Sequence, residues 1–304
     1  MASERMRHLI ERLRAAPIRP ETTLDEQRAV FDEMGNTFPA PEGVKTEAVD
    51  ADGVPCEWVD ATDGGTGHVL IYLHGGGYVI GSAQSHRETI ARFSRALGTR
   101  VLYVGYRLAP EHPCPAQLLD ALTAYRWLLG QGINASELAL TGESAGGGLT
   151  IATLVGLRDA GLPLPAAAAV VSPWVDFTLT GQGHVDNADD PLSTAEVIDR
   201  YRRWFSPDLP FADPRVSPVF ADLQGLPPIY VTASLSERLR DDAVLLAERL
   251  QAADVEVVCD LLPDAVHAWT LFPHLPESSE TVQRIAGFIA GHWARSETQR
   301  QESR

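Results

Sequence analysis

The sequence predicts an α/β fold in which helices cover both faces of a mostly parallel sheet. Two continuous apolar runs, LIYL at residues 70–73 and VLYV at 101–104, are typical of strands that are buried on both faces. Helical patterns follow these runs, at residues 85–98 and 115–132. Because strands that alternate with helices usually join one parallel sheet, this order of elements predicts the fold class.

The N-terminal residues predict a helical arm. Met6, Leu9, Ile10 and Leu13 recur at the spacing of one apolar helix face, and residues 24–34 continue in helical style. Arginines on the polar face leave a membrane-surface helix open as an alternative. Docking of the apolar face on the protein's own body is the favoured interpretation, so we expect an arm over residues 1–45.

The alternation of strands and helices runs through the rest of the chain. Residues 44–61 alternate and turn at Asp52-Gly53, which predicts a hairpin. Further strands are expected at residues 137–142, 166–174, 227–234 and 255–262, and further helices at 144–161, 240–253 and 280–296.

An insert at residues 176–222 interrupts this rhythm. It is polar, punctuated by prolines and rich in aromatic residues, with one helix expected at residues 193–205. Because the chain afterwards returns to the same sheet, the insert is more typical of a lid than of a linker. We therefore expect one domain over residues 1–304.

Composition excludes several classes of partner. The formal net charge of −16 argues against nucleic acid and against an anionic membrane. No apolar run approaches the ~18 residues of a membrane span. The charged N-terminus lacks the apolar centre of a signal peptide, so a cytoplasmic protein is expected.

Residue spacing predicts no metal site and no disulfide framework. Cys56, Cys114 and Cys259 lie far apart, without zinc-ligand spacing. An acidic stretch in the insert lacks the glycine and final glutamate of a calcium loop and is interpreted as a solvated loop. Its polar residues are Asp186, Asn187, Asp189 and Asp190. No cofactor is expected.

The motif GESAG at residues 142–146 supplies a candidate nucleophile. It fits G-x-S-x-G and lies between a predicted strand and a predicted helix, which is the context that the motif requires. Glycines allow a sharp turn that presents the hydroxyl of Ser144 above the strand end. The positive end of the following helix favours developing negative charge.

A serine nucleophile needs a base and an acid, which follow it in this order in such folds. His267 lies just beyond the last predicted strand, where a loop can reach Ser144. Glu237 lies three residues past the strand at 227–234 and is the favoured acid. Asp241 and Asp242 remain alternatives, although their place in the first turn of the next helix suits a role at the helix N-terminus. His274 and His292 are interpreted as structural or surface residues.

The motif HGGG at residues 74–77 predicts an oxyanion hole, because glycines let backbone N–H groups approach a developing anion. We assign the donors to Gly75, Gly76 and Ala145, and a scaffold role to His74. Candidate pocket residues are Tyr78, Trp174, Trp204 and Phe205. For the aromatic residues of the insert, a lid core and a pocket wall both remain open.

Together these motifs resemble the hormone-sensitive-lipase-like branch of α/β-hydrolase esterases. The matching stretches are YLHGGGYVIGS, YRLAPEHPCPAQLLDALTAYRWL, TGESAGGGL, SPWVDF, SERLRDDA and VHAW, in family order from about residue 68 to 270. The resemblance implies an eight-stranded sheet, a Ser144–Glu237–His267 triad and no cofactor. One departure is Glu143, where the family usually has aspartate.

The resemblance also implies a helical cap, formed by residues 1–45 and 176–222, over a catalytic core of residues 46–175 and 223–304. The implied function is a serine carboxylesterase acting on short- to medium-chain acyl esters. A lactone hydrolase, including one for terpene lactones, would use the same chemistry. A non-catalytic binder and an amidase are further alternatives, and a homodimer is expected.

Overall fold

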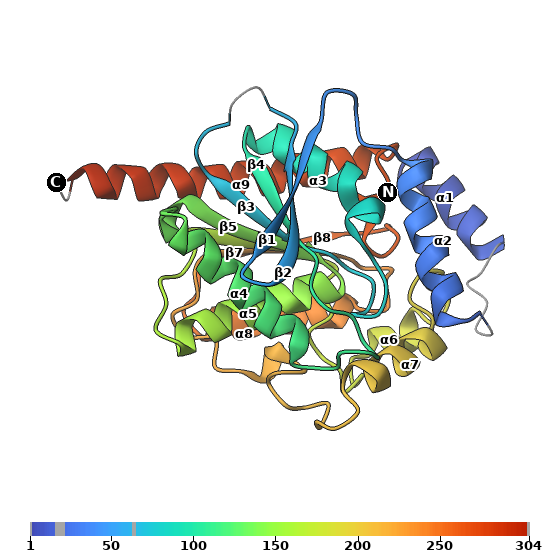
Figure 1. Ribbon diagram of the computed structural model, residues 1–304. Coiled ribbons are helices and arrows are strands. Elements are labelled where there is room, and N and C mark those ends of the chain that lie inside the picture. Colours follow the sequence, from blue (N-terminus) through green and yellow to red (C-terminus); the bar gives the residue numbers. More distant parts are fainter. Residues whose placement is uncertain (1, 16–21, 63–64, 303–304) are drawn as a thin grey trace.

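The computed structural model describes residues 2–15, 22–62 and 65–302 (Figure 1). Residues 1 and 16–21 of the predicted arm therefore lie outside the described residues. Eight strands form one sheet in the order β1-β2-β4-β3-β5-β6-β7-β8. The strands are β1 (Lys45–Ala51), β2 (Val54–Asp60), β3 (Val69–Leu73), β4 (Arg100–Val104), β5 (Leu138–Glu143), β6 (Ala167–Val171), β7 (Ile229–Ser234) and β8 (Val257–Leu262).

Pairing within the sheet follows the predicted pattern. β1 pairs antiparallel with β2, and β2 antiparallel with β4, while all later neighbours pair in parallel. Asp52 and Gly53 form the hairpin turn with φ of 54° and 91°, a conformation in which glycine is unstrained. All five residues of β3 are buried, as expected for a central parallel strand. The predicted eight-stranded, mostly parallel sheet is confirmed.

Helices cover both faces of the sheet (Figure 1). The helices are α1 (Glu4–Ala15), α2 (Leu24–Thr37), α3 (Ala83–Leu97), α4 (Ala116–Gly130), α5 (Ala145–Asp159), α6 (Gly183–Asp186), α7 (Ala195–Phe205), α8 (Arg240–Ala252) and α9 (Pro276–Glu302). Apolar residues of α3 and α9 pack on one face of the sheet, and those of α4, α5 and α8 on the other. The molecule thus has two apolar layers separated by the sheet.

Local signals in the sequence explain where these helices begin and end. At α3, Ser82 accepts a hydrogen bond from Ser85 N, and Gly98 ends the helix in the left-handed conformation. At α2, Thr23 and Glu26 form a reciprocal capping box. These caps satisfy backbone groups that a helix leaves without partners.

The N-terminal helices and the insert lie side by side. Figure 1 shows α1 and α2 next to α6 and α7. Contacts between side chains join them: Tyr201 donates a hydrogen bond of 2.6 Å to Gln27, and Arg14 forms an ion pair with Asp189. The insert contains the predicted helix as α7 and the additional one-turn helix α6, whose four residues are too few to show a periodic pattern.

The prediction of a solvated acidic loop at residues 186–190 is wrong in part. Asp190 is buried and accepts hydrogen bonds from the backbone N–H groups of Ser193 and Arg238. Asn187 donates to the backbone oxygen of Glu237 at 2.7 Å. This loop therefore supports the segment that carries the candidate acid, because its polar groups satisfy buried backbone donors and acceptors.

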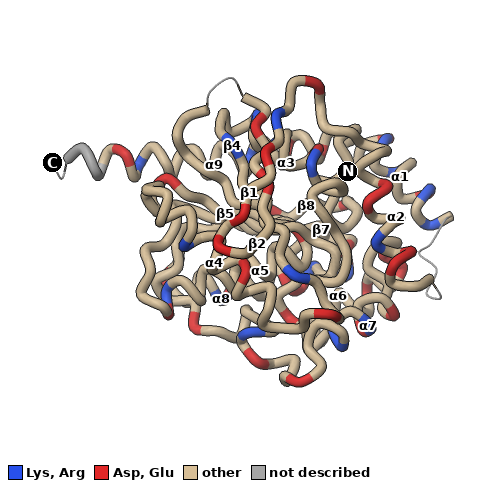
Figure 2. The backbone as a smooth tube through the Cα atoms, in the orientation of Figure 1, with Lys and Arg blue, Asp and Glu red and all other residues tan. Residues whose placement is uncertain are grey.

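Acidic residues are spread over much of the molecule. Acidic positions lie on the sheet edge, the helices and the loops (Figure 2), and the formal net charge of the chain is −16. Among the helices of the described residues, none has both the length and the apolar character needed to cross a membrane. Within the same residues, no cluster of His, Cys, Asp and Glu side chains is arranged to bind a metal ion.

Candidate active site

Ser144 occupies a strained turn between β5 and α5. Its backbone has φ of 55° and ψ of −122°, a region that non-glycine residues rarely adopt. A Cβ atom on Gly146 would lie 1.9 Å from the backbone oxygen of Leu73, so only glycine fits there. The structure therefore contains the sharp strand–turn–helix expected for G-x-S-x-G, and the start of α5 lies directly behind Ser144.

Three side chains form a hydrogen-bonded chain at this turn. His267 Nε2 lies 2.9 Å from Ser144 Oγ, and His267 Nδ1 lies 2.9 Å from Glu237 Oε2. Both distances suit proton transfer between a hydroxyl, an imidazole and a carboxylate. The sequence placed these residues on three separate loops, and the fold brings all three together.

Glu237 is held rigidly beneath the imidazole. Its side chain is fully buried, and Oε1 accepts a hydrogen bond of 3.2 Å from Ser234 N. The hydroxyl of Ser172 is a further partner of its carboxylate and also accepts from Ala268 N at 3.1 Å. The loop that carries the acid is thus joined to the loop that carries His267.

Electrostatics couple the acid and the base. Burial works to lower the pKa of His267, but the hydrogen bond and the charge of Glu237 outweigh it, so that this pKa lies above its usual value. Burial raises the pKa of Glu237, while its bond to His267 opposes that effect. A carboxylate in this place holds one imidazole tautomer and stabilises the imidazolium.

Asp241 and Asp242 make other contacts. Asp242 is buried and accepts from the backbone N–H groups of Val175 and Asp176 at 2.9 and 2.8 Å. Asp241 accepts from Gly183 N at 2.7 Å. Both lie in the first turn of α8, as predicted. Their hydrogen bonds also connect α8 to the segment at residues 175–183, and the role at the helix N-terminus stays a prediction.

The glycine loop of residues 74–77 follows β3 and packs against the Ser144 turn. Gly76 and Gly77 have φ of 106° and 63°, which glycine adopts without strain. A Cβ atom on Gly77 would lie 2.3 Å from the ring of Tyr201 in α7. The ring of Tyr201 therefore lies directly against this loop, which the sequence pattern alone did not indicate.

One oxyanion donor needs correction. Gly75 N donates a short hydrogen bond to the carboxylate of Glu143, so this N–H is already used inside the protein. Within the described part of the chain, the N–H groups of Gly76, Gly77 and Ala145 have no acceptor. The geometry thus favours Gly77 in place of Gly75. The run of three glycines was the signal for Gly77, but sequence cannot tell which N–H is turned inward.

His74 supports the loop. Its Nδ1 lies 2.7 Å from the backbone oxygen of Gly75, and its ring stacks on Tyr106 with centroids 4.2 Å apart. Burial, followed by the nearby His86, lowers the pKa of His74 to about 3. A neutral imidazole in this environment suits the scaffold role predicted for it.

Three of the four predicted pocket residues, Tyr78, Trp174 and Phe205, belong to one aromatic cluster with Phe177. Tyr78 stacks on Phe205 with ring centroids 3.9 Å apart, and Trp174 stacks on Phe177 at 4.0 Å. The backbone N–H of Trp174 donates to Ser144 O at 2.9 Å. Trp204 is only half-buried and stacks on Tyr201. Tyr78, Trp174 and Phe205 are nearly inaccessible, which suits a packed wall.

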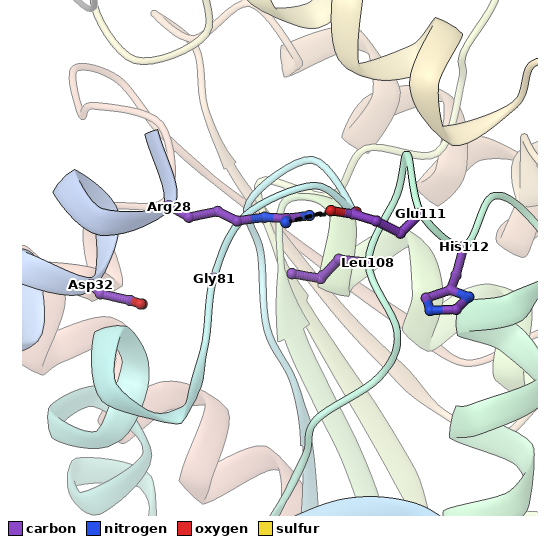
Figure 3. A pocket seen from close by; sticks show the side chains of 6 residues that line it. All are labelled: Arg28, Asp32, Gly81, Leu108, Glu111 and His112. Carbon is purple, nitrogen blue, oxygen red and sulfur yellow. Dashed lines mark hydrogen bonds and ion pairs between the residues drawn. The ribbon is translucent and has the colours of Figure 1, made fainter. Parts of the chain in front are cut away.

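A cavity of about 420 Å³ lies beside the glycine loop, between α2 and the segment after β4. Figure 3 shows Arg28 of α2 reaching across it to Glu111, with N–O distances of 2.7 Å. Arg28 also donates to the backbone oxygen of Val79 at 3.0 Å. The remaining lining residues are Asp32, Gly81, Leu108 and His112. None of these lining residues belongs to the hydrogen-bonded set of Ser144, His267 and Glu237. This cavity therefore marks where α2 attaches to the core.

Fold and site together define an α/β hydrolase with a serine, histidine and glutamate at its centre. A family model described as the alpha/beta hydrolase fold matches residues 70–271. The chain belongs to this family.

Individual relatives show which branch of the family this chain resembles. An acetyl-hydrolase of Streptomyces hygroscopicus is 40% identical over 229 residues, covering 73% of this chain and 75% of the relative. An esterase of Acinetobacter venetianus is 31% identical over 264 residues, covering 86% of this chain and 87% of the relative. The crystal structure of an esterase from the bacterial hormone-sensitive lipase family matches with a TM-score of 0.92 and 41% identity, covering 96% and 99% of the two chains. The resemblance to hormone-sensitive-lipase-like esterases is confirmed.

Proposed function

We propose that this chain is a serine carboxylesterase that hydrolyses short- to medium-chain acyl esters. The observation that carries this proposal is the hydrogen-bonded chain from Ser144 through His267 to Glu237 beneath a glycine loop. The related proteins are an acetyl-hydrolase and esterases, which agrees with a carboxylic ester hydrolase. The lactone hydrolase and the non-catalytic binder gain no support from these relatives.

The reaction follows from the geometry. Ser144 Oγ attacks the ester carbonyl while His267 Nε2 accepts its proton. Glu237 orients the imidazole and stabilises its positive form, without taking the proton itself. His267 then gives the proton to the leaving alcohol. Water, activated by the same imidazole, attacks the acyl-enzyme and releases the carboxylic acid and free Ser144.

The oxyanion is held by backbone donors. We propose Gly76, Gly77 and Ala145, whose N–H groups have no acceptor within the described residues. Such donors stabilise the tetrahedral intermediate more than the planar ester, which is the condition for faster chemistry. Ala145 is the first residue of α5, so the positive end of that helix adds to its effect.

The cap predicted from residues 1–45 and 176–222 remains part of this proposal. Its support is the contact between α2 and α7 through Gln27 and Tyr201, together with the anchoring of α2 by Arg28. We propose that the aromatic residues Tyr78, Trp174, Trp204 and Phe205 border a compact acyl pocket. A compact pocket would favour short acyl chains over long ones.

Homodimer formation also stays a proposal. The outer strand β8 has partly exposed residues, with Val258 at 39% and Cys259 exposed. β8 is the last strand in the order of the sheet among the described residues, and such an edge is able to pair with the same edge of a second copy. The cytoplasmic location expected from the sequence remains a prediction.

A serine-directed organophosphorus reagent tests the proposed function. We expect one equivalent to attach covalently to Ser144 of the wild-type protein, and none to attach to Ser144→Ala, as measured by intact and peptide mass spectrometry. Matched ester and amide substrates separate an esterase from an amidase. Labelling at a different residue, or no labelling of a folded wild type, would contradict the proposal.

A further inference from the structure

We propose that Glu143 is a positioning residue. Through a buried network with His86 and Tyr72, it fixes the backbone position of the glycine loop of residues 74–77. The inference rests on the proposed esterase function and adds residues that hold its oxyanion donors in place. Glu143 is the last residue of β5 and directly precedes Ser144. Its carboxylate therefore links the nucleophile turn to the loop that follows β3.

The carboxylate of Glu143 has a different partner on each side. Oε1 accepts the short hydrogen bond from Gly75 N, and Oε2 accepts a bond of 2.6 Å from the hydroxyl of Tyr72 in β3. His86 Nε2 of α3 lies 2.9 Å from Oε1 without the geometry of a hydrogen bond, and forms an ion pair with it when the imidazole is protonated. Three separate elements of the core thus meet at this one side chain.

Burial makes these contacts strong. Glu143 and His86 are exposed by 1% and 0%, and Tyr72 by 1%. A carboxylate that is removed from water is stable only when its oxygens have partners, so losing one partner is costly. The network is therefore expected to fix the side chain of Glu143 in a single position.

That position determines the path of the glycine loop. A Cβ atom on Gly75 would lie 2.8 Å from Glu143 Oε1 and 3.2 Å from Ser144 Cβ, so the backbone of the loop rests directly on these two residues. Because Gly75 N is turned toward Glu143, the following N–H groups of Gly76 and Gly77 remain for the substrate oxygen. An oxyanion hole works only when its donors are held within a few tenths of an ångström.

Side-chain length matters at this position. The family usually has aspartate here, which is shorter than glutamate by one carbon–carbon bond, or ~1.5 Å. In the backbone arrangement of this chain, an aspartate would not reach Gly75 N, Tyr72 and His86 together. Glutamine has the correct length but lacks the charge, and its amide offers one acceptor where the carboxylate offers two. The two substitutions therefore separate the effect of side-chain length from the effect of side-chain charge.

The test measures ester hydrolysis by Glu143→Asp and Glu143→Gln, with Tyr72→Phe as a third variant. We expect kcat to fall by ~10–10² in Glu143→Gln and further in Glu143→Asp, with KM changed by less than about threefold, because the loss falls on the transition state. A trifluoromethyl ketone, which forms an oxyanion on Ser144, should lose affinity by a factor similar to the loss in kcat/KM.

The matched control is Glu88→Gln. Glu88 is a buried carboxylate of α3 that bonds to Arg92, and among the described residues it has no hydrogen bond with the glycine loop of residues 74–77. We expect it to retain wild-type kcat and inhibitor affinity, whatever it costs in thermal stability. Thermal unfolding of each variant shows that it is folded at the assay temperature.

Two outcomes overturn the inference: folded Glu143 variants with wild-type kcat and inhibitor affinity, or equal losses in Glu88→Gln. If Glu143→Asp and Glu143→Gln do not fold, Tyr72→Phe takes their place in the test, because it removes one partner of Glu143 and leaves the carboxylate in place. A lower kcat and weaker inhibitor binding in Tyr72→Phe would support the inference, and wild-type values of both would overturn it. A wild type that is inactive on esters would instead contradict the proposed function, so the two failures are distinguishable.

Discussion

The hydroxyl of Tyr201 donates a 2.6 Å hydrogen bond to Gln27 Oε1, and thereby joins α7 of the insert to α2 of the N-terminal arm. The ring of the same tyrosine lies against Gly77 of the glycine loop. One side chain thus connects two sequence-distant segments with the candidate oxyanion hole. If these segments form a cap, this contact helps to keep it closed over the site.

Tyr201→Phe tests the role of that contact. The substitution keeps the ring against Gly77 but leaves Gln27 Oε1 without its buried donor, which should cost ~1–3 kcal/mol of unfolding free energy. We expect KM to rise severalfold with little change in kcat, because α2 and α7 would separate more readily. Steady-state kinetics and urea unfolding measure the two effects.

Tyr125→Phe is the matched control for Tyr201→Phe. Tyr125 is buried in α4 and donates a hydrogen bond of 2.9 Å to Pro163 O, on the face of the sheet packed by α4 and α5. It should lower stability by a similar amount and leave KM unchanged. An equal rise of KM in both variants would show that the effect of Tyr201→Phe is general destabilisation.

The pH dependence of kcat/KM follows from the pairing of His267 with Glu237. Neutral imidazole is the base, so activity falls as pH drops through the pKa of His267, which lies above its usual value of ~6.5. Glu237→Gln removes the charge that raises this pKa, so the acid limb should move to lower pH. We expect kcat to fall at the same time by up to about 10⁴.

Asp190→Asn provides a milder version of the same experiment. The charge of Asp190 also raises the pKa of His267, but without a direct hydrogen bond. A smaller shift of the acid limb in the same direction is expected, with most of kcat retained. A shift to higher pH in either variant would contradict this electrostatic account.

Gly146→Ala tests the packing of the nucleophile turn. Its Cβ would lie 1.9 Å from Leu73 O and 2.5 Å from His74 O, so backbone must move. We expect a loss of ~1–3 kcal/mol or more in unfolding free energy, together with a large loss of kcat. Denaturant unfolding and ester hydrolysis measure both.

Gly287→Ala serves as the control for this glycine. It lies within α9, and a Cβ there would meet no atom within 4 Å. Because alanine stabilises a helix interior, this variant should gain ~0.5–1 kcal/mol and keep full activity. Comparable losses in both variants would mean that the clash at Gly146 is not the cause.

Much of this architecture could be predicted from local patterns. The buried strands, the hairpin turn at Asp52-Gly53 and the strand–serine–helix junction all depend on short-range sequence features. The chain order serine, acid, histidine then limited the choice of partners for Ser144. The structure brings Glu237 and His267 to hydrogen-bonding distance as that order requires.

The features that escaped prediction depend on contacts between distant segments. Gly75 N is turned toward Glu143 by the packing of β3 against β5, which no pattern in the glycine run reveals. The lack of a calcium-loop pattern predicts a solvated loop at Asp190, yet this residue is buried and accepts hydrogen bonds from Arg238 N and Ser193 N. Polar residues in long inserts are satisfied by tertiary partners, and sequence periodicity carries no information about them.

The central claim is ester hydrolysis by Ser144, and a series of p-nitrophenyl esters with acyl chains from ~2 to ~16 carbons tests it most directly, given the compact pocket proposed. The account predicts rates that peak at short chains and fall steeply for long ones, and no activity above background for Ser144→Ala. Wild-type activity that survives in folded Ser144→Ala, or a folded wild type inactive on every ester, would contradict it.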